Sequence, residues 1–235
     1  MTVFMLTVRA LLLRRRSLAL LLAVATVPFF VVLNTLRGDL SPDVQAIIVG
    51  RLLITTVTPL VALVLAVTAI GDERESGTIV YLATSRLSRM QVAGEKMLAA
   101  VVCAVVLLLP ALVSIVYLGS RLDVGTDNIL RAVAGSVLVA AVYAAVFVAV
   151  GLVLRRALIA GIVYILIWEG AIATVAPSAE RVSLTAWGRA ITDGGLYGLE
   201  EGLVPTLSAT SGAVVLAVCT LAAVLLAGWR LGRMD

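Results

Sequence analysis

The sequence predicts an all-α integral membrane protein with six transmembrane helices, an N-terminal interfacial amphipathic helix and both termini in the cytoplasm. The 235 residues are 62% hydrophobic, with a mean hydropathy of +1.14. Soluble domains are only about half apolar, and the excess here would have to lie on a soluble protein's surface. The apolar runs are about 20 residues long, the length of a helix that crosses a hydrocarbon core of about 30 Å. They lack the strict alternation of a β-barrel strand.

One transmembrane domain, residues 1–235, accounts for the whole pattern. Residues 1–16 place apolar side chains near one helical face and end in three arginines. A signal peptide is the alternative, but no small-residue cleavage site follows, so we expect an uncleaved interfacial helix. The predicted spans are residues 17–36, 46–70, 97–118, 129–154, 157–176 and 211–227. Residues 71–96 form a charged connector, and residues 177–210 form an outer segment with possible re-entrant helices.

The basic residues orient this layout. Twelve of the eighteen fall in segments that it places inside, and six fall in outer segments or outer span ends. Such an excess follows the positive-inside rule and places both termini and the connector in the cytoplasm. The net charge of +4 is therefore interpreted as membrane orientation rather than nucleic-acid binding.

Several kinds of chemistry are disfavoured by composition. The chain has no histidine, which is the commonest general base and metal ligand. Its two cysteines, Cys103 and Cys219, lie inside predicted spans and have no metal-ligand or disulfide spacing. No P-loop motif is present, so we expect no ATP hydrolysis by this chain and no cofactor or metal bound to it.

Polar residues inside the second span allow two interpretations. Thr55, Thr56 and Thr58 precede Pro59. Their hydroxyls could satisfy the backbone carbonyls that the proline frees, which is the commoner arrangement in membrane helices. Alternatively, they form a polar stripe along a translocation path.

The fifth span contains Glu169, the acidic residue that lies deepest in any predicted span. An intramembrane carboxylate is costly and usually faces a partner or water. A structural hydrogen bond or a pairing with Arg51 or Arg131 is one possibility, and a functional site is the other. In the fourth span small residues recur every four positions and predict close helix packing; they are Ala132, Ser136, Ala140 and Ala144.

The connector carries a recognisable pattern: Glu73-Arg74-Glu75-x-Gly77-Thr78, then Leu82, Ser88-Arg89 and Gly94-x-Lys96. The chain resembles the permease subunits of the type-2 ATP-binding-cassette transporters. The resemblance rests on these residues, on their place between spans two and three, and on the six-span layout. The sequence departs from that family's pattern in two places. Arg86 stands where the family usually has proline, and Glu95 separates Gly94 from Lys96.

The resemblance implies a membrane permease for export that dimerises, as a homodimer or a heterodimer, and binds a separate cytoplasmic ATPase that holds ATP and Mg²⁺. A coupling helix in the connector would dock on that ATPase. Glu73, Arg74 and Glu75 would form charge-assisted hydrogen bonds at the base of span two. Gly77 would permit a change of chain direction and Thr78 would cap the next helix. The docking face would consist of Tyr81, Leu82 and Leu87.

The resemblance also implies that spans one, two and five line the central path, which makes five residues candidate path contacts: Thr55, Thr56, Thr58, Tyr164 and Glu169. The expected location is the cell membrane of a prokaryote. Without the Gly77-Thr78 pair and its position, we would interpret the block of charged residues 72–75 as a solvated loop. A self-contained secondary transporter or channel that uses Glu169 is the alternative function. An intramembrane enzyme that uses Glu169 with Glu200 and Glu201 is disfavoured, since the last two lie in the outer segment.

Overall fold

The computed structural model of the protein describes residues 3–12, 15–39, 41, 44, 47–75, 89–154, 156–173, 179, 181–196 and 208–232. All the regular elements in these residues are helical. They are α1 (Val3–Leu12), α2 (Arg15–Arg37), η1 (Ile47–Val57), α4 (Thr58–Glu75), α6 (Arg89–Arg121), α7 (Thr126–Val153), α8 (Ala157–Val163), η2 (Tyr164–Ile172), α11 (Leu184–Leu196) and α12 (Ala209–Gly232). The elements named η are π-helices, and each is continuous with the α-helix beside it.

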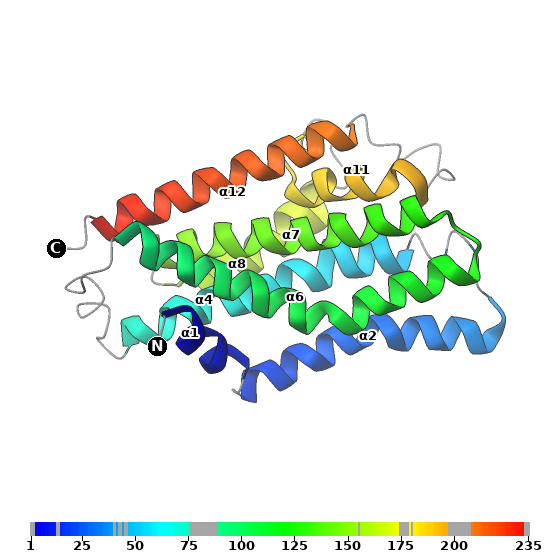
Figure 1. The fold of residues 1–235 in the computed structure, drawn as a ribbon, viewed down its shortest axis with the longest axis horizontal. Coiled ribbons are helices and arrows are strands. Elements are labelled where there is room, and N and C mark those ends of the chain that lie inside the picture. The colour runs from blue at the N-terminus through cyan, green and yellow to red at the C-terminus, as the bar shows by residue number, and fades with distance from the viewer. Residues whose placement is uncertain are drawn as a thin grey trace.

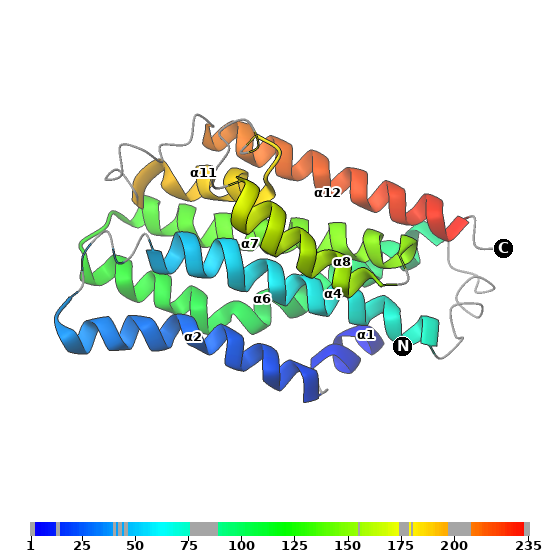
Figure 2. The same ribbon diagram turned by 180° about the vertical axis from the view of Figure 1, so that it is seen from behind.

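The long helices run side by side as one bundle (Figure 1). Helix α1, the last turn of α4, the first turn of α6 and the last turn of α12 lie at the same end, which we call the termini end. The short helix α11 lies at the opposite, far end, beside the first turns of α7 and α12 (Figures 1 and 2). The last turn of α4 and the first turn of α6, which the connector joins, therefore both lie at the termini end.

Five helices in the described part of the chain are long and apolar enough to cross a membrane: residues 17–37, 47–70, 94–121, 126–153 and 209–230. They match predicted spans one to four and six to within a few residues. The predicted fifth span, residues 157–176, corresponds to a shorter apolar helix over residues 157–172. Because residues 174–178 lie outside the described part, the six-span count stays a prediction.

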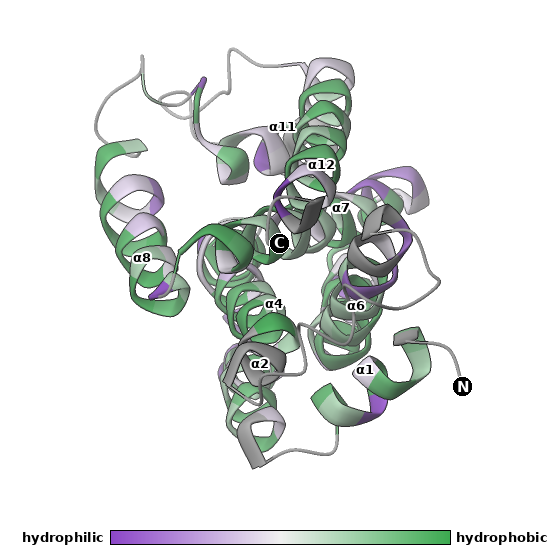
Figure 3. Cartoon of the chain, turned by 90° about the vertical axis from the view of Figure 1, so that its left-hand side faces the viewer, coloured by the Kyte–Doolittle hydropathy of each residue, from purple (hydrophilic) through white to green (hydrophobic). Residues whose placement is uncertain are grey.

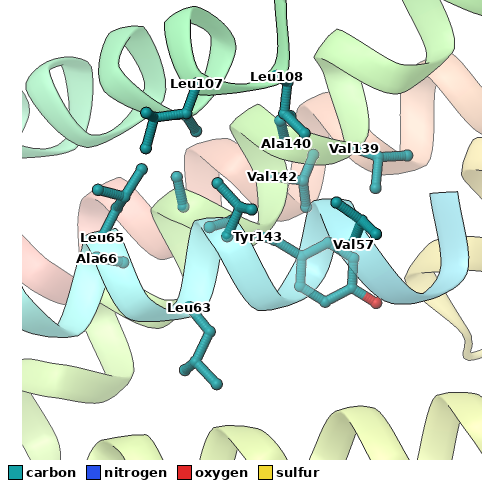
Figure 4. Close-up of a cluster of buried hydrophobic side chains, with 14 of the residues drawn as sticks. Val57, Leu63, Leu65, Ala66, Leu107, Leu108, Val139, Ala140, Val142 and Tyr143 are labelled. Atoms are coloured by element: carbon teal, nitrogen blue, oxygen red, sulfur yellow. The ribbon is translucent and has the colours of Figure 1, made fainter. Parts of the chain in front are cut away.

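Helix α7 is the centre of the bundle and packs against α4, α6, α11 and α12. The predicted small face of this helix is fully buried, from Ala132 through Ser136 and Ala140 to Ala144. Small side chains let neighbouring backbones approach closely, which is how helices associate inside lipid. Figure 4 shows the apolar cluster that α7 forms with η1, α4 and α6, with Val57, Leu65, Leu107 and Val142 among its members.

The helices of the bundle consist largely of hydrophobic residues, as their colours in the end-on view show (Figure 3). Helices α2 and α12 expose most of their large apolar side chains, including Leu22 and Leu221. The α8–η2 helix buries a single stripe at a spacing of four residues: Ala157, Gly161, Ile165, Glu169 and Ala173. Such surfaces suit a hydrocarbon environment, so we treat this chain as a membrane protein.

The end of α2 illustrates how local sequence fixes a boundary. Gly38 follows the helix with φ of +70°, a left-handed conformation that glycine adopts without a Cβ clash. The amide of Gly38 donates to the Thr35 carbonyl at 3.2 Å, and the Asp39 amide donates to the Asn34 carbonyl at 3.0 Å. This pair of bonds is a Schellman motif, which satisfies carbonyls that the helix end leaves open.

Candidate functional site: a buried carboxylate at the start of α11

The most strongly built polar site in the described residues surrounds Glu169, whose side chain is 1% exposed. Oε1 of the carboxylate accepts hydrogen bonds from the Tyr143 hydroxyl at 2.7 Å, the Tyr164 hydroxyl at 2.9 Å and the Leu184 amide at 3.0 Å. Oε2 accepts from the hydroxyl of Thr185 at 2.6 Å and from the hydroxyl of Ser183. The five donors are neutral and come from α7, η2 and the start of α11.

The π-helical form of η2 brings Tyr164 to Glu169. The two residues are five positions apart, and in an α-helix they would point about 140° away from each other. A π-helix instead pairs residues five positions apart, so the two side chains lie on one face. The phenol of Tyr164 therefore donates to the carboxylate of its own helix.

The first turn of α11 supplies the other side of the site. Ser183 precedes the helix, and its Oγ accepts the amide of Ala186 at 3.0 Å, which is the bond of an N-cap residue. The Leu184 amide, one of the unpaired donors of the first turn, turns to Glu169 instead. A carboxylate at this position also interacts favourably with the positive end of the helix dipole.

Tyr143 joins the central helix to this site. Its side chain is fully buried in the middle of α7, and the centroid of its ring lies 5.5 Å from the centroid of the Phe147 ring. Figure 4 shows the Tyr143 ring beside Val57 of η1, with the hydroxyl oxygen at the border of the apolar cluster. One carboxylate thus ties η2, α7 and α11 together inside the bundle.

The sequence left open a pairing of Glu169 with Arg51 or Arg131, but in the structure the carboxylate is bound by neutral donors instead. Arg51 and Arg131 are both exposed, and the five hydrogen bonds to the carboxylate come from other groups. The alternative in which Glu169 makes a structural hydrogen bond is therefore what the geometry shows. The described residues contain no cluster of acidic or cysteine side chains that could hold a metal ion.

The three threonines of the second span behave differently from one another. The hydroxyls of Thr55 and Thr56 donate to the carbonyls of Gly50 and Arg51, at 2.9 Å and 3.1 Å. Both bonds reach five residues back, as the π-helical backbone of η1 requires. Thr58 is fully buried, and its hydroxyl has no hydrogen-bond partner in the described part of the protein.

The predicted coupling residues lie at the border of the described chain. Glu73, Arg74 and Glu75 belong to the last turn of α4, so this charge block continues the helix of the second span instead of opening a loop. Their side chains lie outside the described structure. The remaining predicted coupling residues lie wholly outside it: Gly77, Thr78, Tyr81, Leu82 and Leu87.

The sequence did not single out three of the four side chains that hold Glu169. Tyr143 is the one phenol of a span made mostly of alanine and valine, a signal that could have marked it. Ser183 precedes an amphipathic helix by one residue, the N-cap position. Thr185 carried no signal, because a threonine in a helical first turn is common.

Removing single hydroxyls should weaken the fold by a modest amount. We expect Tyr143→Phe and Tyr164→Phe each to lower the free energy of unfolding by about 0.6 kcal/mol and at most about 1.7 kcal/mol, the average and the largest value measured for side-chain hydrogen bonds inside a membrane protein. Unfolding in mixed detergent micelles measures both variants. Tyr117→Phe is the control, since that phenol is exposed on α6. Two variants as stable as the parent would show that these hydrogen bonds contribute nothing.

Comparison with known protein families places these features in context. A family model described as "ABC-2 family transporter protein" matches residues 11–171, which is well over half of the chain. The matched range includes α2 to the last but one residue of η2, and with them Tyr143, Tyr164 and Glu169. A search of curated proteins gives no match. The chain therefore belongs to the ABC-2 transporter family and is a membrane permease that takes part in transport.

Proposed function

We propose that this chain is the membrane-spanning subunit of an ATP-binding-cassette exporter and that a separate cytoplasmic ATPase drives it through the connector, residues 71–96. The family match supports transport. The observation that carries the rest is the place of the connector. It begins in the last turns of α4, which ends at Glu75, and finishes in the first two turns of α6, which begins at Arg89. Both helix ends lie at the termini end (Figure 1).

In this proposal the termini end faces the cytoplasm, as the excess of basic residues predicts. The α8–η2 helix crosses the membrane as the fifth of six spans. Two permease copies, identical or different, would enclose the substrate path, and two ATPase copies would bind ATP and Mg²⁺. The membrane would be the cell membrane of a prokaryote.

Energy transfer in this proposal is mechanical. ATP binding would draw the ATPase copies together and displace the connector, which continues directly into two bundle helices. A helix with its apolar neighbours packed at native density moves as a rigid unit, so displacement at one end reaches the other. The spans would then alternate between inward and outward access.

The candidate path residues contribute unequally. The hydroxyls of Thr55 and Thr56 are already bonded to their own helix. Thr58 is the stronger candidate for a substrate contact, because a buried hydroxyl without a partner gains a hydrogen bond when the spans separate. Glu169 and Tyr164 would act at the wall of the path by holding α11 in place.

The alternative of a secondary transporter with Glu169 as its ion site has less support. Both oxygens of the carboxylate are already engaged by five donors, which leaves little capacity for a coordinated cation. The enzymatic alternative relied on Glu200 and Glu201, which lie outside the described residues.

Co-purification with the ATPase tests the proposal. We expect the parent permease to retain an ATP-binding-cassette ATPase encoded beside it, and Glu73→Ala and Arg74→Ala to reduce that binding by about tenfold or more, as loss of a buried charged pair does at protein interfaces. Arg121→Ala is the matched control, since this exposed arginine ends α6 at the far end. If both connector variants bind and stimulate the ATPase as the parent does, the coupling role of these residues is wrong.

A further inference from the structure

Glu95 is the residue that departs from the family pattern between Gly94 and Lys96, and the structure gives it a partner. Its Oε2 accepts the backbone amide of Phe4 at 3.0 Å. Phe4 lies in the first turn of α1, where backbone amides have no partner within the helix. The acidic side chain thus satisfies a free donor and lies at the positive end of the α1 dipole.

The next residue, Lys96, makes a second connection from the same turn of α6. Its side chain is 4% exposed, and its Nζ donates to the carbonyl of Ala69 in α4 at 3.0 Å. A buried ammonium is retained only where hydrogen bonds compensate the lost hydration. Two consecutive residues of α6 therefore hold two different helices at the termini end.

Further contacts extend the connection along α1 and beyond it. The thiol of Cys103, two turns after Glu95 on α6, lies 4.0 Å from the Val8 carbonyl. At the other end of α1, the Ser17 hydroxyl donates to the Leu11 carbonyl and so joins α1 to the start of α2. Helix α1 is attached to α6 at two places and to α2 at a third.

We propose that Glu95 and Lys96 are positioning residues that transmit displacement of the connector to α1 and α4 at the same time. The inference rests on the proposed function above, because it assumes that the connector is driven by an ATPase. Residues 95 and 96 lie in the first two turns of α6 and are the last two residues of the connector. A shift of the start of α6 would displace α1 through the bond between Glu95 and the Phe4 amide, and α4 through the bond between Lys96 and the Ala69 carbonyl. Helix α1 would in turn displace the start of α2 through the bond between Leu11 and Ser17.

A distance measurement between spin labels tests the inference without knowledge of the substrate. The labels are placed at Met5 of α1 and Val153 at the end of α7, both exposed, in a background with Cys103→Ser and Cys219→Ser. We expect ATP to change the populations of the Met5–Val153 distances in the permease–ATPase complex. In Glu95→Ala and Lys96→Met the ATP-dependent shift in population ratio should fall by about 2- to 30-fold, the range for residues that carry coupling.

Conservative variants separate coupling from mere stability. Glu95→Gln keeps an oxygen that can accept a hydrogen bond from the Phe4 amide, so it should retain the ATP-dependent shift in population ratio. Leu98→Ala should also retain this shift, because Leu98 lies on an exposed side of the same helix. An unchanged shift in Glu95→Ala and Lys96→Met overturns the inference, and so does a loss in Glu95→Gln equal to that in Glu95→Ala. Failure of the labelled parent to bind any ATPase would instead contradict the proposed function.

Discussion

Replacing Glu169 with alanine is expected to destabilise the protein more than any other single polar substitution in the described residues. The change removes both acceptor oxygens at once and leaves four hydroxyl donors, a phenol of its own helix among them, without their partner. The Leu184 amide at the start of α11 also loses its acceptor. At an average of about 0.6 kcal/mol for each of the five bonds, the loss should reach about 3 kcal/mol or more. Unfolding of the purified protein in mixed micelles measures it.

New hydrogen bonds among the remaining groups should regain part of the lost stability. The hydroxyls of Ser183 and Thr185 are 3.1 Å apart and can bond to each other once the carboxylate is gone. Glu169→Gln keeps one acceptor oxygen, so we expect it to lie between the parent and the alanine variant. Leu166→Ala is the matched control, because Leu166 is exposed on the same helix.

The consequence should be local as well as global. Because Ser183, Leu184 and Thr185 are all held by Glu169, the alanine variant should lose protection of α11 before the rest of the bundle opens. Amide hydrogen exchange resolves this order. Equal protection of α11 in the parent and in Glu169→Ala would show that packing alone, and not the carboxylate, holds that helix in place.

The transmembrane layout could be predicted from the sequence because hydropathy and length decide it almost alone. A run such as residues 126–153 has one stable solution in lipid, a helix that satisfies its own backbone. The predicted fifth span, residues 157–176, is described only as far as residue 173, so its full length stays a prediction.

The meeting of Tyr164 and Glu169 could not be predicted because it depends on backbone geometry that has no sequence signal. Hydroxyls in regular helices bond four residues back, as Ser114 and Ser136 do here. Tyr164 and Glu169 meet only because η2 is a π-helix. Glu169 itself was predicted to matter, since an intramembrane acid requires partners, but the sequence could not choose between arginines and hydroxyls.

Replacing Gly188 with leucine is the second large effect that we expect. Gly188 is buried in α11, and a Cβ built on it would lie 2.1 Å from Cγ2 of Val139 in α7 and 3.6 Å from Cγ2 of Ile54 in η1. Val139 is fully buried and β-branched, so its methyl group cannot rotate away without a strained side chain. Leucine is a better helix former than glycine by up to about 1 kcal/mol. Overpacking of such a site costs about 1–3 kcal/mol and occasionally more, so the net effect should be a clear loss of stability.

A double-mutant cycle shows whether this overlap is the cause. Gly188→Ala adds the methyl group that meets Val139, and Val139→Ala removes the methyl group that it meets. Each variant alone should be less stable than the parent, the first through overlap and the second through a cavity. Because the added atom then occupies the vacated space, the double variant should be more stable than the sum of the two losses predicts, with a coupling energy of about 0.5–3 kcal/mol. Gly94→Ala is the control, since nothing lies within 4 Å of a Cβ there. Strict additivity would place the origin of the Gly188 effect outside the contact between α11 and α7.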